Sequence, residues 1–209
     1  MTVRPARPAS AAARPAAPFP PERPPWWPSP GPHERPGIYE RLLGQRIVMA
    51  HGQLDDGAAT RLCAQLLTLD AEGDGPIRFE LQNLGADLTA ALAVMGVLDV
   101  VGVPVQARAA GRITGPALGV LAACGQRCGY PNALFVLSEP VVSFDGPLTA
   151  VAAREEQTRA MLDALYVRLA EVTGREVGRI RDDARARRVL TAADAERYGL
   201  LTGLLAGRR

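Results

Sequence analysis

The chain has 209 residues, a hydrophobic content of 47% and a formal net charge of +2. This length suits one domain of ordinary size plus a tail, and the apolar content is enough for a substantial core. Because the net charge is so small, we expect neither a nucleic acid nor an anionic membrane surface as a partner.

Residues 1–36 form a compositionally separate region that precedes the folded domain, for which we predict the range 37–209. The region holds 12 of the 18 prolines, with alanine and arginine between them. Such a composition predicts an extended or disordered tail. Its one unusual feature is the adjacent pair Trp26 and Trp27, which is either a docking peptide for an aromatic groove or an incidental part of the tail.

The remaining sequence alternates between strand and helix patterns. Apolar runs and alternating residues predict strands at 47–49, 77–81, 103–107 and 133–137, and helical spacing of apolar residues predicts helices at 58–69, 88–98 and 151–172. Pro116 suits the first turn of a further helix, and a last helix begins after Thr191, with Asp194 near its N-terminus. The alternation predicts an α/β fold with parallel strands and right-handed crossovers.

Three cysteines do not make a disulfide framework or a metal site. We expect Cys63 on a helix, and we expect Cys124 and Cys128 to flank a turn at residues 125–127. A structural zinc site needs four ligands, and no histidine or further cysteine is near this pair, so we expect no metal and no cofactor. No apolar run approaches the roughly 20 residues of a membrane helix, and the N-terminus lacks the apolar core of a signal peptide, so we expect a cytoplasmic protein.

A series of short segments carries motifs in a fixed order along the domain: Ile38–Leu43, Gln53–Asp56, Ala64–Glu72, Phe79–Ala90, Pro131–Ala133, Thr173–Arg175 and Leu190–Leu200. In this order they resemble the motifs of the Clp protease proteolytic-subunit family (ClpP, the Clp serine peptidases). The resemblance implies the ββα spiral that this family shares with the crotonases. It also implies that the long helix is the family's "handle", which interlocks two heptameric rings.

The same resemblance locates the family's Ser-His-Asp triad on residues that cannot reproduce it. Gly115 stands at the serine position, Ser138 at the histidine position and Arg187 at the aspartate position. At the oxyanion positions, Ala86 replaces a glycine, and Pro116 has no backbone N–H to donate. A triad needs an imidazole base and a carboxylate that orients it.

The count of histidines supports this interpretation without any alignment. The chain has two histidines, His33 in the proline-rich tail and His51 after the first strand. Both histidines are far in sequence from the triad positions, and the chain has no third histidine that could act as a general base. We therefore expect that the chain is not an enzyme.

Three functional hypotheses remain open. The first is a non-catalytic pseudoprotease subunit that assembles with ClpP paralogues in a ring, with a Clp AAA+ ATPase unfoldase as a further candidate partner. The second is a weak serine or threonine hydrolase with a rebuilt site that uses Thr114 or Ser138. The third is a crotonase-like acyl-CoA-binding protein, although the proline after Gly115 weakens the oxyanion hole that such chemistry requires.

Overall fold

The computed structural model describes residues 37–140 and 148–206. The predicted tail at 1–36, including Trp26 and Trp27, lies outside the described residues, as do residues 141–147.

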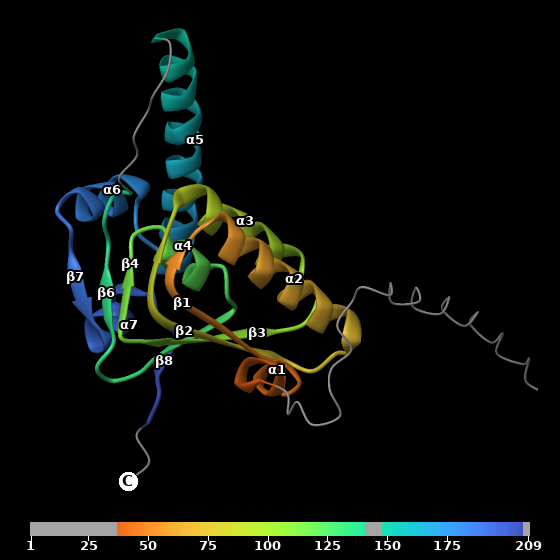
Figure 1. Ribbon diagram of the computed structural model, residues 1–209. Helices are drawn as coiled ribbons and strands as arrows, with labels where there is room; N and C mark the ends of the chain where they lie inside the picture. Colours follow the sequence, from red (N-terminus) through yellow and green to blue (C-terminus); the bar gives the residue numbers. More distant parts are fainter. Residues whose placement is uncertain (1–36, 141–147, 207–209) are drawn as a thin grey trace, which may run out of the picture. The chain divides into compact units, whose positions relative to one another are not determined.

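The strands form two sheets (Figure 1). The larger sheet is parallel throughout and has the order β1 (Ile47–Leu54), β2 (Ile77–Ala86), β3 (Val105–Ala110), β5 (Gln126–Gly129) and β8 (Gly203–Leu204). The smaller sheet contains β4 (Arg112–Thr114), β6 (Leu134–Val136) and β7 (Val189–Thr191). β4 pairs with β6 in parallel, whereas β6 pairs with β7 in the antiparallel direction. The predicted α/β fold with a mostly parallel sheet is thus confirmed.

Seven helices occur in the described ranges: α1 (Ile38–Leu43), α2 (Asp56–Glu72), α3 (Leu88–Val100), α4 (Ala117–Ala122), α5 (Leu148–Thr173), α6 (Val177–Arg185) and α7 (Ala192–Tyr198). Local capping explains where several of them begin. The Asp55 side chain accepts a hydrogen bond of 2.7 Å from the Ala58 N–H at the start of α2. Thr191 and Asp194 form a reciprocal capping box at the start of α7.

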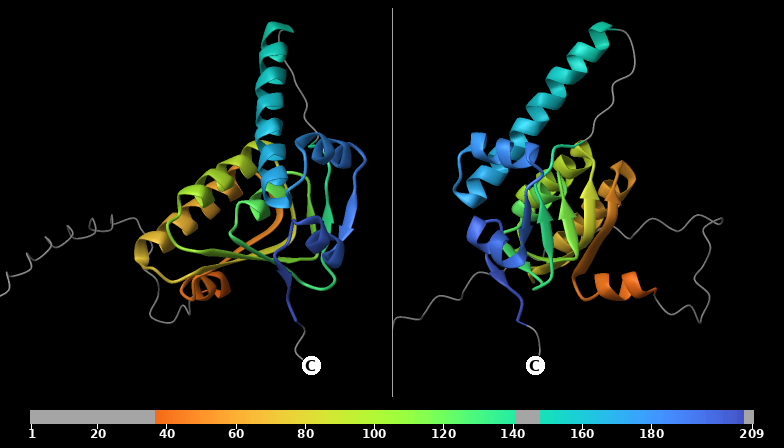
Figure 2. Two further views of the ribbon diagram at one scale, coloured as in Figure 1. Left: turned by 180° about the vertical axis from the view of Figure 1, so that it is seen from behind. Right: turned by 90° about the vertical axis from the view of Figure 1, so that its left-hand side faces the viewer.

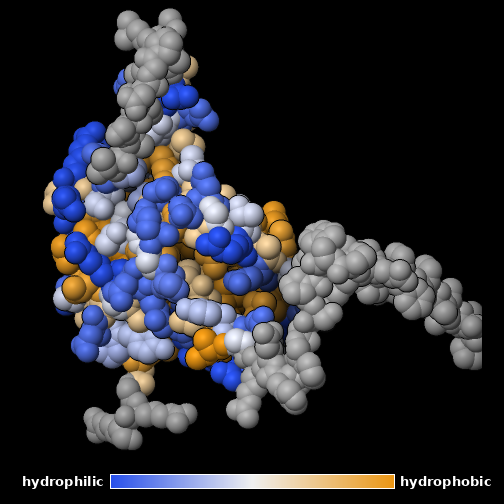
Figure 3. Space-filling view, in the orientation of Figure 1, coloured by the Kyte–Doolittle hydropathy of each residue, from blue (hydrophilic) through white to orange (hydrophobic). Residues whose placement is uncertain are grey.

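The core lies between the larger sheet and the helices that pack beside it (Figure 2). Phe79 and Leu81 on β2 are fully buried, as are Leu66 on α2 and Val94 on α3. Most of the face shown in Figure 3 is hydrophilic, with apolar residues in small patches between. No helix of the described ranges is both long and apolar enough to cross a membrane.

The sequence prediction differs from the structure mainly at short elements. Residues 126–129 form the strand β5. The turn expected at 125–127 is therefore wrong at residues 126 and 127, and Cys128 lies within a strand. The first two strands extend to Leu54 and Ala86, well beyond the apolar runs that predicted them. Both extensions matter because they carry the polar ends of β1 and β2 to the candidate site.

The long helix α5 has 26 residues, and its first half extends away from the sheets (Figures 1 and 2). Side chains at 153–157 are exposed, whereas Leu165, Tyr166 and Leu169 in the second half are buried. The helix is therefore anchored at its carboxyl end. Its expected role as a handle between two rings stays a prediction.

Candidate functional site

A polar cavity of about 420 Å³ lies where β1, β2, β4 and β6 end, and we call it the strand-end cavity. Parallel strands present their carboxyl ends at one edge of a sheet, which is where ligand sites of α/β folds occur. The residues that line it include Gln53, Asn83, Gly85, Arg112, Thr114, Ser138 and Arg187.

The turn at Gly115 connects β4 to α4 beside this cavity. Gly115 has a φ of +56°, and its N–H donates to the Val136 carbonyl at 3.0 Å, which ties the turn to β6. A Cβ atom placed on Gly115 would lie 3.3 Å from the Ser138 hydroxyl oxygen. Pro116 follows as the cap of α4, with a φ of −60°, and its ring nitrogen carries no proton to donate. The structure thus brings Gly115 and Ser138 into direct proximity.

Arg187 reaches the same cavity from the loop between α6 and β7. It has a φ of +50°, a left-handed backbone conformation that is uncommon for a residue with a side chain. Its N–H donates to the Ala184 carbonyl at 3.1 Å, and the Leu137 N–H donates to the Arg188 carbonyl at 2.9 Å. These bonds fix the loop against the segment that carries Ser138.

A buried ionic cluster anchors the loop that presents Arg187. Asp183 is 5% exposed and accepts hydrogen bonds from the Tyr198 hydroxyl at 2.7 Å and from the Arg188 guanidinium at 3.1 Å. Burial alone would raise the pKa of the Asp183 carboxyl, but the bonds from Tyr198 and Arg188 outweigh it and hold the pKa below its usual range. Burial and the bond to Asp183 raise the pKa of Tyr198.

The two expected oxyanion positions are arranged differently. Gly85 lines the cavity, whereas Ala86 is 8% exposed, ends β2 and is not among the lining residues. A Cβ atom on Gly85 would lie 2.7 Å from the Gln53 side-chain oxygen, so a larger residue would require Gln53 to move. Ser138 and Arg187 thus line the cavity together with Gly85, whereas Ala86 does not. Gly115 is not a lining residue and adjoins the cavity through its proximity to Ser138.

Sequence reasoning missed Gln53, Asn83 and Arg112 as lining residues. Asn83 has a φ of +46°, and its side-chain oxygen accepts a 3.0 Å hydrogen bond from the Arg112 N–H. These three residues follow apolar strand patterns in the sequence, and this position was the one signal that could have indicated them. Thr114, which the sequence offers as an alternative hydroxyl, lines the cavity.

Histidine and cysteine lie elsewhere in the described ranges. His51 is an exposed residue of β1 whose ring Nε2 is 3.3 Å from the Tyr39 hydroxyl, and it does not line the strand-end cavity. Cys63, Cys124 and Cys128 are free thiols. Among the described residues, no group of three or more potential ligands from histidine, cysteine, aspartate and glutamate could hold a metal ion.

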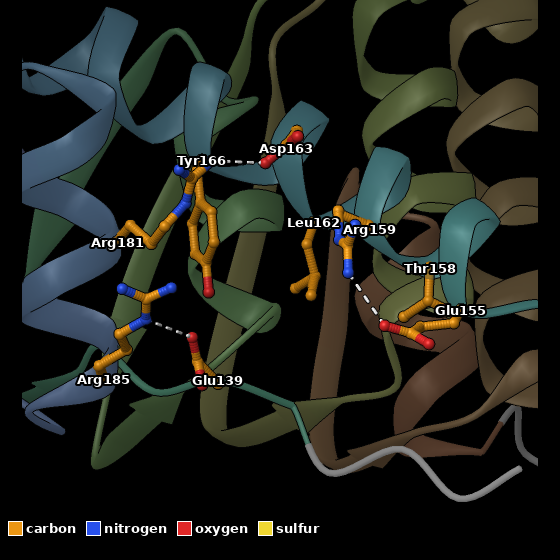
Figure 4. A pocket seen from close by; sticks show the side chains of 9 residues that line it. All are labelled: Glu139, Glu155, Thr158, Arg159, Leu162, Asp163, Tyr166, Arg181 and Arg185. Carbon is orange, nitrogen blue, oxygen red and sulfur yellow. Dashed lines mark hydrogen bonds and ion pairs between the residues drawn. The ribbon is translucent and has the colours of Figure 1, made fainter. Parts of the chain in front are cut away.

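A second cavity of about 570 Å³ lies beside the middle of α5, and we call it the α5 cavity (Figure 4). Its charged side chains form ion pairs, so their charges largely cancel. The Tyr166 hydroxyl is buried and has no hydrogen-bond partner within the described residues. Burial, and after it the charge of Glu139, raise the pKa of Tyr166. The ion pairs are Arg159–Glu155 at 2.9 Å, Arg181–Asp163 at 2.7 Å and Arg185–Glu139 at 3.5 Å.

The fold and the strand-end cavity define an α/β protein with a site at the carboxyl edge of its parallel strands. A family model described as Clp protease matches residues 33–208. The chain is 34% identical over 174 residues to ATP-dependent Clp protease proteolytic subunit 1 of Nocardia farcinica, which covers 82% of this chain and 88% of the relative. It is 29% identical over 171 residues to the protein of the same name from Mycobacterium bovis, covering 80% and 86%. The chain therefore belongs to the Clp protease family.

These relatives correct one expectation. The expectation that the chain is not an enzyme is wrong. Its relatives are named as proteolytic subunits, and these names point to a peptidase. The expectation judged activity from the side chains of a single chain at Gly115, Ser138 and Arg187.

Proposed function

We propose that the chain is a proteolytic subunit of an ATP-dependent Clp-type peptidase that acts on polypeptides in a ring assembly with other subunits of its family. The family match across nearly the whole described domain carries this proposal. The fold supports it, because the polar cavity lies at the carboxyl ends of the parallel strands.

Within this subunit, we propose that Gly115, Ser138 and Arg187 occupy the positions of the family's serine, histidine and aspartate. Their proximity supports this assignment, since the Ser138 hydroxyl lies 3.3 Å from a Cβ atom placed on Gly115, and Arg187 lines the same cavity. A hydroxyl nucleophile requires a base within hydrogen-bond reach. Within the part of the chain that the structure describes, no histidine, aspartate or glutamate lines the strand-end cavity.

The catalytic unit of this proposal is the assembled complex, in which this subunit acts on polypeptides together with family members that carry serine, histidine and aspartate at these positions. The proposed partners are ClpP paralogues, with a Clp AAA+ ATPase unfoldase docking on the ring. The heptameric stoichiometry and the cytoplasmic location stay predictions.

The test is co-expression with an active Clp proteolytic subunit from the same cell, followed by native mass spectrometry and a peptidase assay. We expect masses of mixed rings and hydrolysis of a short fluorogenic peptide by the purified mixed species. Recovering only monomers or unmixed rings would overturn the proposal. A matched preparation, in which the partner's nucleophilic serine is replaced by alanine, shows how much hydrolysis depends on the partner.

A hydrolase centred on Ser138 is a second candidate, because this hydroxyl lines the cavity together with Thr114 and Arg187. Labelling of the isolated chain by a fluorophosphonate probe measures it. Labelling that disappears in Ser138→Ala and persists in Thr114→Ala would establish Ser138 as a nucleophile. The crotonase-like acyl-CoA alternative stays a hypothesis.

A further inference from the structure

The strand-end cavity is a cationic site. Arg112 and Arg187 line it, and no aspartate or glutamate of residues 37–140 or 148–206 does. Neither guanidinium makes a hydrogen bond or an ion pair with any residue of the described ranges. The arginines of the α5 cavity differ, because each of them pairs with a carboxylate.

Both arginines project from fixed backbone. The Asn83 side chain accepts a hydrogen bond from the Arg112 N–H, and the buried Asp183–Arg188–Tyr198 cluster anchors the loop of Arg187. Asn83 and Arg187 also have left-handed backbone conformations, with φ values of +46° and +50°. Backbone strain of this kind persists only where the surroundings impose it, and it concentrates at functional sites.

The remaining polar groups of the cavity suit an oxyanion. Ser138 and Thr114 provide hydroxyl donors beside the two guanidinium groups. Guanidinium forms paired, charge-assisted hydrogen bonds to carboxylate and phosphate oxygens. A volume of about 420 Å³ exceeds what a bare ion needs and can hold a terminal residue with its carboxylate.

We propose that the strand-end cavity binds the C-terminal carboxylate of a peptide, with Arg112 and Arg187 contacting its oxygens. The choice of a peptide over a free phosphate rests on the proposed function, since a proteolytic assembly produces peptides that each carry a new C-terminal carboxylate. Binding needs no covalent step and no second subunit, so the isolated chain suffices for its test.

The experiment measures fluorescence anisotropy of an N-terminally labelled Ala-Ala-Leu peptide with the isolated full chain. We expect the free acid to bind at least about ten-fold more tightly than its C-terminal amide, and affinity to fall as salt rises. Arg187→Gln and Arg112→Gln should each weaken the acid at least about ten-fold and leave the amide unchanged. Arg185→Gln is the matched control, because it removes the same charge two residues away, where the guanidinium pairs with Glu139.

Three results would overturn the inference. They are equal binding of acid and amide, no binding of either peptide to a chain whose circular dichroism shows it folded, and displacement of the peptide by inorganic phosphate at equal concentration. The last result would assign the site to a free oxyanion. Because ring assembly is measured separately, mixed rings without peptide binding would refute this inference alone, whereas peptide binding without mixed rings would refute the proposed function alone.

Discussion

Burial controls the chemistry of the Cys124 thiol. The residue is 1% exposed, its Sγ donates to the Val120 carbonyl at 3.5 Å, and burial raises its pKa to about 12, against a smaller opposing effect of Arg127. Since only the thiolate reacts, we expect Cys124 to stay unmodified by a thiol reagent at pH 8 in the native chain and to react after unfolding. Mass spectrometry of labelled peptides measures this, and prompt native labelling of Cys124 would contradict it.

The buried carboxyl of Asp183 makes stability depend on pH in a defined direction. Its folded pKa is depressed, so its contribution to the free energy of unfolding is present above the unfolded pKa of about 3.9 and is lost as pH falls through the folded value. Tyr198→Phe removes one of its donors. We expect this variant to lower the free energy of unfolding by about 1–3 kcal/mol at pH 7, and by less below about pH 3.9.

Urea unfolding at pH 7 and pH 3 measures this difference. Tyr39→Phe is the control, because the Tyr39 hydroxyl contacts only the exposed His51 ring among described residues, and we expect a change within about 0.5 kcal/mol. A Tyr198→Phe variant as stable as the original at pH 7 would show that Asp183 does not depend on this hydrogen bond.

At the residue scale, sequence reasoning reached the side chains that lie next to recognisable motifs. Neighbouring motifs locate Gly115, Ser138 and Arg187; in the structure Ser138 and Arg187 line one cavity, and Gly115 lies next to Ser138. Arg112 and Asn83 were missed because their meeting depends on a hydrogen bond across 29 positions of sequence, which no local pattern reveals. Whether the triad positions are degenerate stays a prediction.

Among the helices, α7 ends in a turn that glycine alone fits without strain. Gly199 has a φ of +91°, and a Cβ atom there would lie 2.9 Å from the Thr173 Cα. We expect Gly199→Ala to lower the free energy of unfolding by at least about 1 kcal/mol. The new methyl group would press against the Thr173 backbone, which cannot move aside as a flexible side chain could. Thermal unfolding with calorimetry measures the change.

Gly96→Ala is the matched control with the opposite sign. Gly96 lies inside α3, is exposed, and has no atom within 4 Å of a placed Cβ. Alanine there should raise the free energy of unfolding by up to about 1 kcal/mol. Equal effects of the two substitutions would show that the turn at Gly199 tolerates a side chain.

Elements that carry their own periodic pattern were predictable, and the short strands were not. The apolar spacing of α2, α3 and α5 predicted these helices to within a few residues at each end. The strands β4, β7 and β8 have three, three and two residues, too few for alternation to show. They form because pairing partners elsewhere in the chain complete their hydrogen bonds.

At the scale of the whole molecule, the first half of α5 is the surface through which we expect ring assembly. Ala160 is exposed on this helix, and Ala71 is exposed on α2. Ala160→Glu should reduce the yield of mixed rings at least about ten-fold without changing the monomer's stability, since a new charge must be desolvated at an interface. Ala71→Glu is the control and should leave assembly unchanged. Native mass spectrometry measures both, and equal yields would place the interface elsewhere.

The fold of the whole domain could be predicted because motifs spread from Ile38 to Leu200 agree on one order of strands and helices. The antiparallel pairing of β6 with β7 departs from the expected parallel pattern, because the chain returns through α6 from the opposite direction. The division at residue 36 stays a prediction.

A helix of 26 residues is about 39 Å long, and the side chains at 153–157 of α5 are exposed to solvent. Amide protons in such a segment exchange with deuterium quickly, because local fraying opens their hydrogen bonds. Those of the buried second half should exchange far more slowly. The protection of these outer turns therefore reports, without any label, whether another surface has closed over them.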